Sequence, residues 1–152
     1  MDGQQTMERY LDKTMYENNE KQKDTINGKM KSVRISCSYE ETSITLGFPV
    51  QEWQANRGGM MHGGMICTAF DITAAAIARF CAGENYAPTI SLDVKYIRPV
   101  AIGDQLIVTA KATAAGKRIT QIVCEARSKN TGKLAATAAS VYMNVDTTKE
   151  KR

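Results

Sequence analysis

Apolar side chains change their spacing several times along the chain, and each change predicts a new element. Near the amino terminus, four of them recur at helical spacing: Met7, Tyr10, Leu11 and Met15. This spacing, in a charged segment without proline, predicts an amphipathic helix that ends in the polar stretch of residues 17–28. Apolar and polar positions then alternate over residues 33–39 and again over residues 44–48, which predicts a β-hairpin.

A helical period returns over residues 62–81, where apolar side chains occupy nearly every face. A helix of this kind must be covered on almost all sides. Small residues on one stripe would let another backbone come close. We therefore expect a sheet to wrap this helix and a second copy of the chain to shield the rest.

Four strand-like segments follow the central helix, over residues 89–98, 105–115, 118–128 and 134–145. Short turns rich in Gly and Asn join three of them, which predicts antiparallel pairing. In the first of these strands, plain alternation puts Thr89, Ser91 and Asp93 on one face, with Asp93 expected in solvent or at a dimer edge. The element order is that of an α+β domain, whose curved antiparallel sheet encloses one long helix.

One domain accounts for most of the chain. We expect it to span residues 31–146, with residues 1–30 as a helical extension that packs on it and residues 147–152 as a charged tail. The 20 basic and 16 acidic residues give a net charge of +4, but much of the charge lies near the two ends with both signs mixed. This pattern argues against a nucleic-acid partner and fits a mildly basic rim for a phosphate-bearing small molecule.

Cysteine usage and the amino terminus indicate a reduced, cytoplasmic protein. The four cysteines, at positions 37, 67, 81 and 124, lie in apolar segments without the spacing of a metal site, so we expect reduced core residues and no metal. The chain begins without the apolar stretch of a signal peptide, and Asp71 and Arg79 interrupt its longest apolar run. We therefore expect no membrane span.

The candidate chemistry lies at the start of the central helix. Residues 56–64 read Asn-Arg-Gly-Gly-Met-Met-His-Gly-Gly, and the one acidic residue of the following helix is Asp71. Two glycines after His62 leave backbone amides uncovered where the helix begins. A carboxylate about two turns inside an apolar helix is costly unless it has a function. This combination predicts a site for acyl chemistry.

Several separated motifs carry a resemblance to a known family. In order they are Asn56, His62-Gly63-Gly64, Asp71, the strand Thr89-Ile90-Ser91-Leu92-Asp93-Val94, Tyr96-Ile97-Arg98-Pro99 and Gly103-Asp104. This order resembles the hotdog-fold acyl-CoA thioesterases of the 4-hydroxybenzoyl-CoA thioesterase superfamily, in particular the phenylacetyl-CoA thioesterase-like subgroup. The resemblance covers roughly residues 33–145 and leaves residues 1–30 unmatched.

The resemblance implies a hotdog fold and hydrolysis of an acyl- or aryl-CoA thioester to a carboxylic acid and free coenzyme A. In this family the acid of the central helix, here Asp71, is the base or nucleophile, and the Gly63 amide stabilises the oxyanion. Asn56 and Thr89 match residues that position the water or the carbonyl. Other roles stay open: Asp71 as an inter-subunit hydrogen-bond partner, Asn56 as a turn cap, Thr89 as an ordinary strand residue.

The only histidine, His62, is a further candidate general base, although at a helix start its ring more often supports the loop. For the phosphates of coenzyme A the candidates are Arg98, Lys117 and Arg118, whose alternative role is to protect strand edges. We expect no cofactor beyond coenzyme A as part of the substrate. The resemblance also implies a dimer or a dimer of dimers, with Asp71 of one subunit facing Asn56 and Gly63 of the other.

Two other classes of function stay open. A non-catalytic acyl-CoA sensor would use the same cavity, but the first thirty residues are too short for a full helix-turn-helix module. A hotdog hydratase acting on enoyl-CoA is the third class. Those enzymes typically pair an Asp with a His on one short segment, whereas His62 and Asp71 are nine positions apart here.

Overall fold

The computed structural model describes residues 1–146, so the predicted charged tail lies outside the described residues. Six strands form one antiparallel sheet in the order β1-β2-β4-β5-β6-β3. They are β1 Val33–Ser38, β2 Ser43–Pro49, β3 Thr89–Tyr96, β4 Gln105–Ala115, β5 Ile119–Ser128 and β6 Leu134–Met143. The predicted hairpin and the four later strands are confirmed, and their ends shift by no more than two residues.

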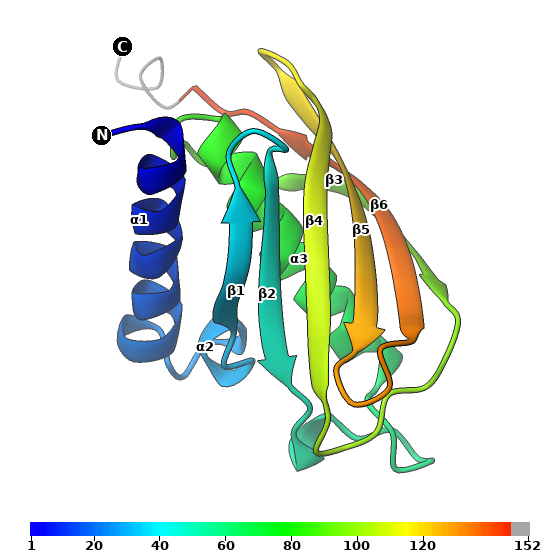
Figure 1. The fold of residues 1–152 in the computed structure, drawn as a ribbon. Coiled ribbons are helices and arrows are strands. Elements are labelled where there is room, and N and C mark those ends of the chain that lie inside the picture. The colour runs from blue at the N-terminus through cyan, green and yellow to red at the C-terminus, as the bar shows by residue number, and fades with distance from the viewer. Residues whose placement is uncertain (147–152) are drawn as a thin grey trace.

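The long helix α3, Gly63–Cys81, lies on the concave side of the sheet, which curves around it (Figure 1). Strand β5 shows why the sheet covers the helix, because every second side chain along it is buried. Within the described residues, α3 is the one helix long and apolar enough to cross a membrane, but it is half buried, as a core helix is. A curved antiparallel sheet around one central helix is the hotdog fold, so the predicted fold is confirmed.

The amino-terminal extension packs against the sheet edge and the central helix. Helix α1, Gly3–Tyr16, begins at a capping box between Asp2 and Gln5 and lies beside β1 (Figure 1). The predicted apolar face of α1 is confirmed as buried. The polar stretch after it is more ordered than the sequence indicated, because it forms a π-helical turn, η1 Glu17–Lys21, and a short helix, α2 Ile26–Lys29. A 3₁₀ helix, η2 Glu52–Gln54, follows β2.

Tyr10 ties the extension to the central helix. Its hydroxyl donates a hydrogen bond of 2.8 Å to the carbonyl of Ala76, and its ring centroid lies 5.4 Å from that of Phe80. Burial raises the pKa of Tyr10 to about 12. The folded chain therefore keeps the phenol proton at a pH where the unfolded chain releases it. The free energy of unfolding therefore contains a contribution from the neutral Tyr10 side chain. This contribution is fully present below pH 10 and is lost as the pH rises from 10 toward 12.

We expect Tyr10→Phe to lower the free energy of unfolding by about 1 kcal/mol at pH 8, because one buried hydrogen bond is lost and the ring is kept. At pH 11 the variant and the wild type should differ little, because by then the wild type has lost about 1.4 kcal/mol through proton release from its unfolded state. Urea unfolding at the two pH values measures both differences. An equal deficit at pH 8 and pH 11 would contradict the assigned pKa shift.

Candidate active site

Asp71 is held in place by two hydroxyl groups from the sheet. Its Oδ1 accepts hydrogen bonds from Thr89 Oγ1 at 2.8 Å and from the hydroxyl of Tyr142 at 2.7 Å. Tyr142 is fully buried. Its burial, and to a smaller extent its hydrogen bond to Asp71, raises the pKa of the phenol, so the hydroxyl keeps its proton and stays a donor. Asp71 Oδ2 makes no hydrogen bond with any described residue. One carboxylate oxygen is thus fixed while the other is available for chemistry.

A β-bulge turns Thr89 toward Asp71. The pairing of β3 with β6 shifts between Thr89 and Ser91, so Thr89 lies opposite the inward-facing Tyr142. The expectation that Thr89 shares a face with Ser91 and Asp93 is therefore wrong. Plain alternation does not account for the extra residue of a bulge. Asp93 is exposed, as expected.

The sequence interpretation missed Tyr142 as a candidate site residue. Tyr142 follows the buried Ala138 and Ser140 at intervals of two near the end of β6. This alternation is the signal that Tyr142 faces the helix. That signal does not tell which helix residue it meets. The contact with Asp71 depends on how α3 lies across the sheet.

For the thioester hydrolysis that the sequence resemblance implies, Tyr142→Phe should lower kcat/KM about tenfold, because the orienting hydrogen bond is lost while Thr89 still holds Asp71. Thiol release under steady-state conditions measures this loss. Tyr86→Phe is a matched control, since Tyr86 is exposed and outside the candidate site. Unchanged kinetics in Tyr142→Phe would mean that the phenol only fills the core.

The start of α3 presents an unoccupied backbone donor. His62 caps the helix, and its Nδ1 accepts a hydrogen bond of 2.8 Å from the amide of Gly64. This contact is the loop-supporting role anticipated for the histidine. The Gly63 amide makes no hydrogen bond with any described residue. Helix N-termini favour negative charge, so the Gly63 amide can bind an oxyanion.

Tyr96 covers this helix start and was not anticipated from the sequence. Its hydroxyl lies 2.8 Å from the Gly63 carbonyl, to which it donates, and 3.0 Å from the Cys67 sulfur. A Cβ on Gly63 would lie 3.2 Å from Tyr96. Glycine therefore gives the tyrosine ring room beside the free amide.

Asn56 shapes the loop before α3. Its Oδ1 accepts hydrogen bonds from the amides of Gly58 at 2.8 Å and Met60 at 3.1 Å, which is the turn-capping role. Its Nδ2 makes no hydrogen bond with any described residue, so the amide group can still donate to a substrate. Asn56 and Gly63 line one cavity of about 350 Å³, together with Tyr96 and Arg98.

A single chain does not bring all the candidates together. Asp71 lines a different cavity, of about 120 Å³. It lies eight residues after Gly63 on the same helix, which separates the two by about 12 Å along the axis. The structure thus groups Asp71 with Thr89, and Asn56 with Gly63 and His62. Any site that uses both groups needs a second chain.

The three candidate phosphate ligands also lie at two opposite ends of the sheet. Arg98 lines the cavity at Gly63 and donates a hydrogen bond of 2.9 Å to the Leu134 carbonyl. Lys117 and Arg118 are exposed in the turn between β4 and β5, at the opposite end of the sheet. Within one chain these cations form no common patch.

Three of the four cysteines are less buried than expected. Only Cys124 is a buried core residue, and burial raises the pKa of its thiol to about 12. Cys37 and Cys81 are partly buried and pack against the core, whereas Cys67 is partly buried and does not belong to it. All four are free thiols. In residues 1–146, no group of three or more His, Cys, Asp or Glu side chains is placed to hold a metal.

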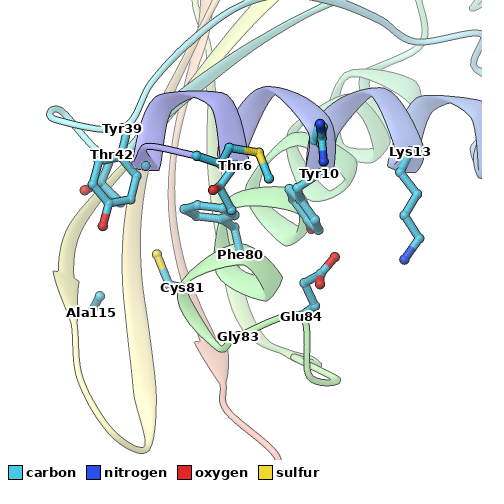
Figure 2. A pocket seen from close by; sticks show the side chains of 13 residues that line it. Thr6, Tyr10, Lys13, Tyr39, Thr42, Phe80, Cys81, Gly83, Glu84 and Ala115 are labelled. Carbon is cyan, nitrogen blue, oxygen red and sulfur yellow. The ribbon is translucent and has the colours of Figure 1, made fainter.

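A larger hollow than these two cavities, with a volume of about 1170 Å³, lies between α1 and the end of α3. Figure 2 shows Tyr10 and Phe80 at its centre, with Lys13 and Glu84 toward one end. It contains none of the candidate catalytic residues.

Comparison with known proteins identifies the family and the fold. The family model described as the thioesterase superfamily matches residues 58–135. Mouse acyl-coenzyme A thioesterase 13 is 34% identical over 89 residues, which are 57% of this chain and 62% of that protein. The chain spans about half to three fifths of the length of the curated relatives it matches.

Solved structures extend the match to the amino-terminal extension. The Escherichia coli PaaI protein from the phenylacetic acid degradation operon matches with a TM-score of 0.78 and 20% identity, over 95% of this chain and 97% of that chain. The smu.793 protein of Streptococcus mutans, whose structure is bound to acetyl CoA, matches with a TM-score of 0.66 and 16% identity, over 75% and 88% of the two chains. At these identities the matches show the fold alone.

Proposed function

Because this chain belongs to the thioesterase superfamily, we propose that it hydrolyses an acyl- or aryl-CoA thioester to a carboxylic acid and free coenzyme A. The observation that carries the proposal is the Asp71 carboxylate, with one oxygen held by Thr89 and Tyr142 and the other without a hydrogen bond to any described residue. The mouse relative named acyl-coenzyme A thioesterase 13 supports the reaction class. The neighbour bound to acetyl CoA supports the ligand class.

In the proposed reaction, Asp71 Oδ2 accepts a proton from a water molecule whose oxygen attacks the thioester carbonyl carbon. The Gly63 amide donates to the carbonyl oxygen as it gains negative charge, and Asn56 Nδ2 can donate to the same oxygen or to the water. The C–S bond then breaks, and the proton leaves on the coenzyme A thiol. In the alternative route, Oδ2 attacks the carbonyl carbon directly, and water hydrolyses the resulting anhydride. Neither route uses a metal or a redox cofactor.

The proposed site lies between two copies of the chain. Strand β3 is an edge of the sheet, and its exposed side chains include Ile90 and Tyr96. An unpaired edge with apolar side chains is a surface for another strand. Antiparallel pairing of β3 with a second β3 across a two-fold axis would set Asp71 of one chain opposite Gly63 of the other.

The same pairing would bring the three candidate phosphate ligands together, although they lie far apart within one chain. It would place Arg98 of one copy near the end of the other copy that carries Lys117 and Arg118. The three could then form a basic rim for the phosphates of coenzyme A, with the thioester between the subunits. A dimer of dimers would repeat this arrangement.

Thiol release from a panel of acyl- and aryl-CoA thioesters tests the proposal. We expect hydrolysis of at least one class with kcat/KM above about 10⁴ M⁻¹ s⁻¹. Folded protein that binds acyl-CoA by calorimetry but releases no thiol would instead be a sensor. Loss of enoyl absorbance without thiol release would indicate a hydratase. Either result would contradict the proposed reaction.

A further inference from the structure

The cavity beside Asp71 is built by the amino-terminal extension and by one face of α3. Its volume is about 120 Å³. The extension contributes Thr14, Asn18 and Asn27, and α3 contributes Asp71, Ile72, Ala75, Ala76 and Arg79. The cavity therefore has an apolar wall on the helix and polar side chains from both the extension and α3.

Three of these polar side chains make no hydrogen bond or ion pair with any described residue. Asn18 is only 8% exposed, yet its side-chain amide makes no hydrogen bond with any described residue. Asn27 and the partly buried Arg79 likewise make no side-chain hydrogen bond or ion pair within residues 1–146. Asn27 and Arg79 are partly exposed, so all three side chains are free to donate hydrogen bonds to a ligand in the cavity.

Close backbone packing holds Asn18 in this position. The residue belongs to the π-helical turn η1, and π-helical turns often occur at functional sites. A Cβ on Gly28 would lie 2.7 Å from the Asn18 carbonyl, so only glycine lets α2 pack this tightly against η1. The extension therefore supplies a fixed wall.

Asp71, Ala75 and Arg79 follow one another at intervals of four on one face of α3. Arg79 lines the same cavity as Asp71 and lies two helical turns further along α3. Ala75, between them, is small and leaves the path open. A ligand whose reacting carbon lies at Asp71 can thus reach the guanidinium with its far end.

We propose that this cavity binds the acyl part of the substrate and selects acyl groups that end in a carboxylate, namely the monothioesters of short dicarboxylic acids. The inference rests on the proposed function. A guanidinium and two amides are hydrogen-bond donors suited to a carboxylate, and the apolar wall suits methylene groups. The cavity holds the volume of about four water molecules, which limits the acyl group to about four or five carbons.

Each of the two cavities then binds a different part of the substrate. The larger cavity at Gly63 of one subunit, with Arg98 at its wall, faces the coenzyme A side of the thioester, and the smaller cavity at Asp71 of the other subunit takes the acyl side. Residues 14–27 act as a specificity element because Thr14, Asn18 and Asn27 form one wall of the acyl cavity.

The test compares matched pairs of thioesters on the full chain: succinyl-CoA with butyryl-CoA, and glutaryl-CoA with pentanoyl-CoA. The wild type should hydrolyse the carboxylate-bearing member of each pair with the higher kcat/KM. Arg79→Gln should lose about 30-fold on that member and change less than about threefold on the neutral one. Arg9→Gln is the control, because this exposed arginine lines the groove of Figure 2 instead and should leave both activities unchanged.

Calorimetric titration with free glutarate gives a readout independent of turnover. Glutarate should bind the wild type and Arg9→Gln but not Arg79→Gln. Hydrolysis that favours the neutral thioesters would overturn this inference and leave the proposed function standing. If no thioester is hydrolysed but glutarate binding still depends on Arg79, the carboxylate site stands and the proposed function fails. Absence of both the preference and the binding overturns the inference.

Discussion

Asp71→Asn should lower kcat/KM for the best thioester substrate by about a thousandfold, the usual effect of removing a general base or nucleophile. The amide keeps the shape of the carboxylate, and its oxygen can still accept the hydrogen bonds from Thr89 and Tyr142. What the variant loses is the basic oxygen, Oδ2, that makes no hydrogen bond with any described residue. The effect should therefore appear in kcat, while acyl-CoA binding persists.

Two measurements separate this loss of chemistry from a loss of folding. The free energy of unfolding of Asp71→Asn should lie within about 1 kcal/mol of the wild type, because both hydrogen bonds to the side chain are retained. Asp24→Asn is the matched control, since Asp24 is exposed in the turn between η1 and α2. A stable Asp71→Asn variant with wild-type thiol release would remove Asp71 from the reaction.

The fold was accessible from the sequence because its signals are periodic. The shift from alternation to a helical period located α3, and the turns rich in Gly and Asn gave antiparallel pairing. Each of these signals is local, and the strong curvature follows from covering a helix that is apolar on nearly every side. Only the polar stretch after α1 was misjudged, because a π-helical turn has no comparable sequence period.

The site was less accessible because its contacts depend on register. The bulge that turns Thr89 toward Asp71 adds one residue to β3 and reverses which side chains face inward. Tyr142 and Tyr96 reach α3 from positions that periodicity marks only as facing the helix. Asn18 lies more than fifty residues from Asp71 in sequence, and only the packing of the extension brings both to one cavity.

Co-expression of two inactive variants should restore activity, because the proposed site takes Asp71 from one subunit and Gly63 from the other. Asp71→Asn retains the oxyanion donor, and Gly63→Val retains the acid but places a side chain 3.2 Å from Tyr96, where the thioester must bind. In a mixed dimer one of the two sites combines two defects and the other is intact. Random pairing should therefore restore about a quarter of wild-type activity, and purified mixed dimers about half.

Dual affinity tags isolate the mixed dimers, and each variant co-expressed with a differently tagged copy of itself gives the background. Asn56→Ala can replace Gly63→Val if the valine variant does not fold, because Asn56 lines the same cavity. If the acid and the amide acted within one chain, no mixed dimer would hold an intact site. Activity at background level in well-folded mixed dimers would therefore refute the shared site.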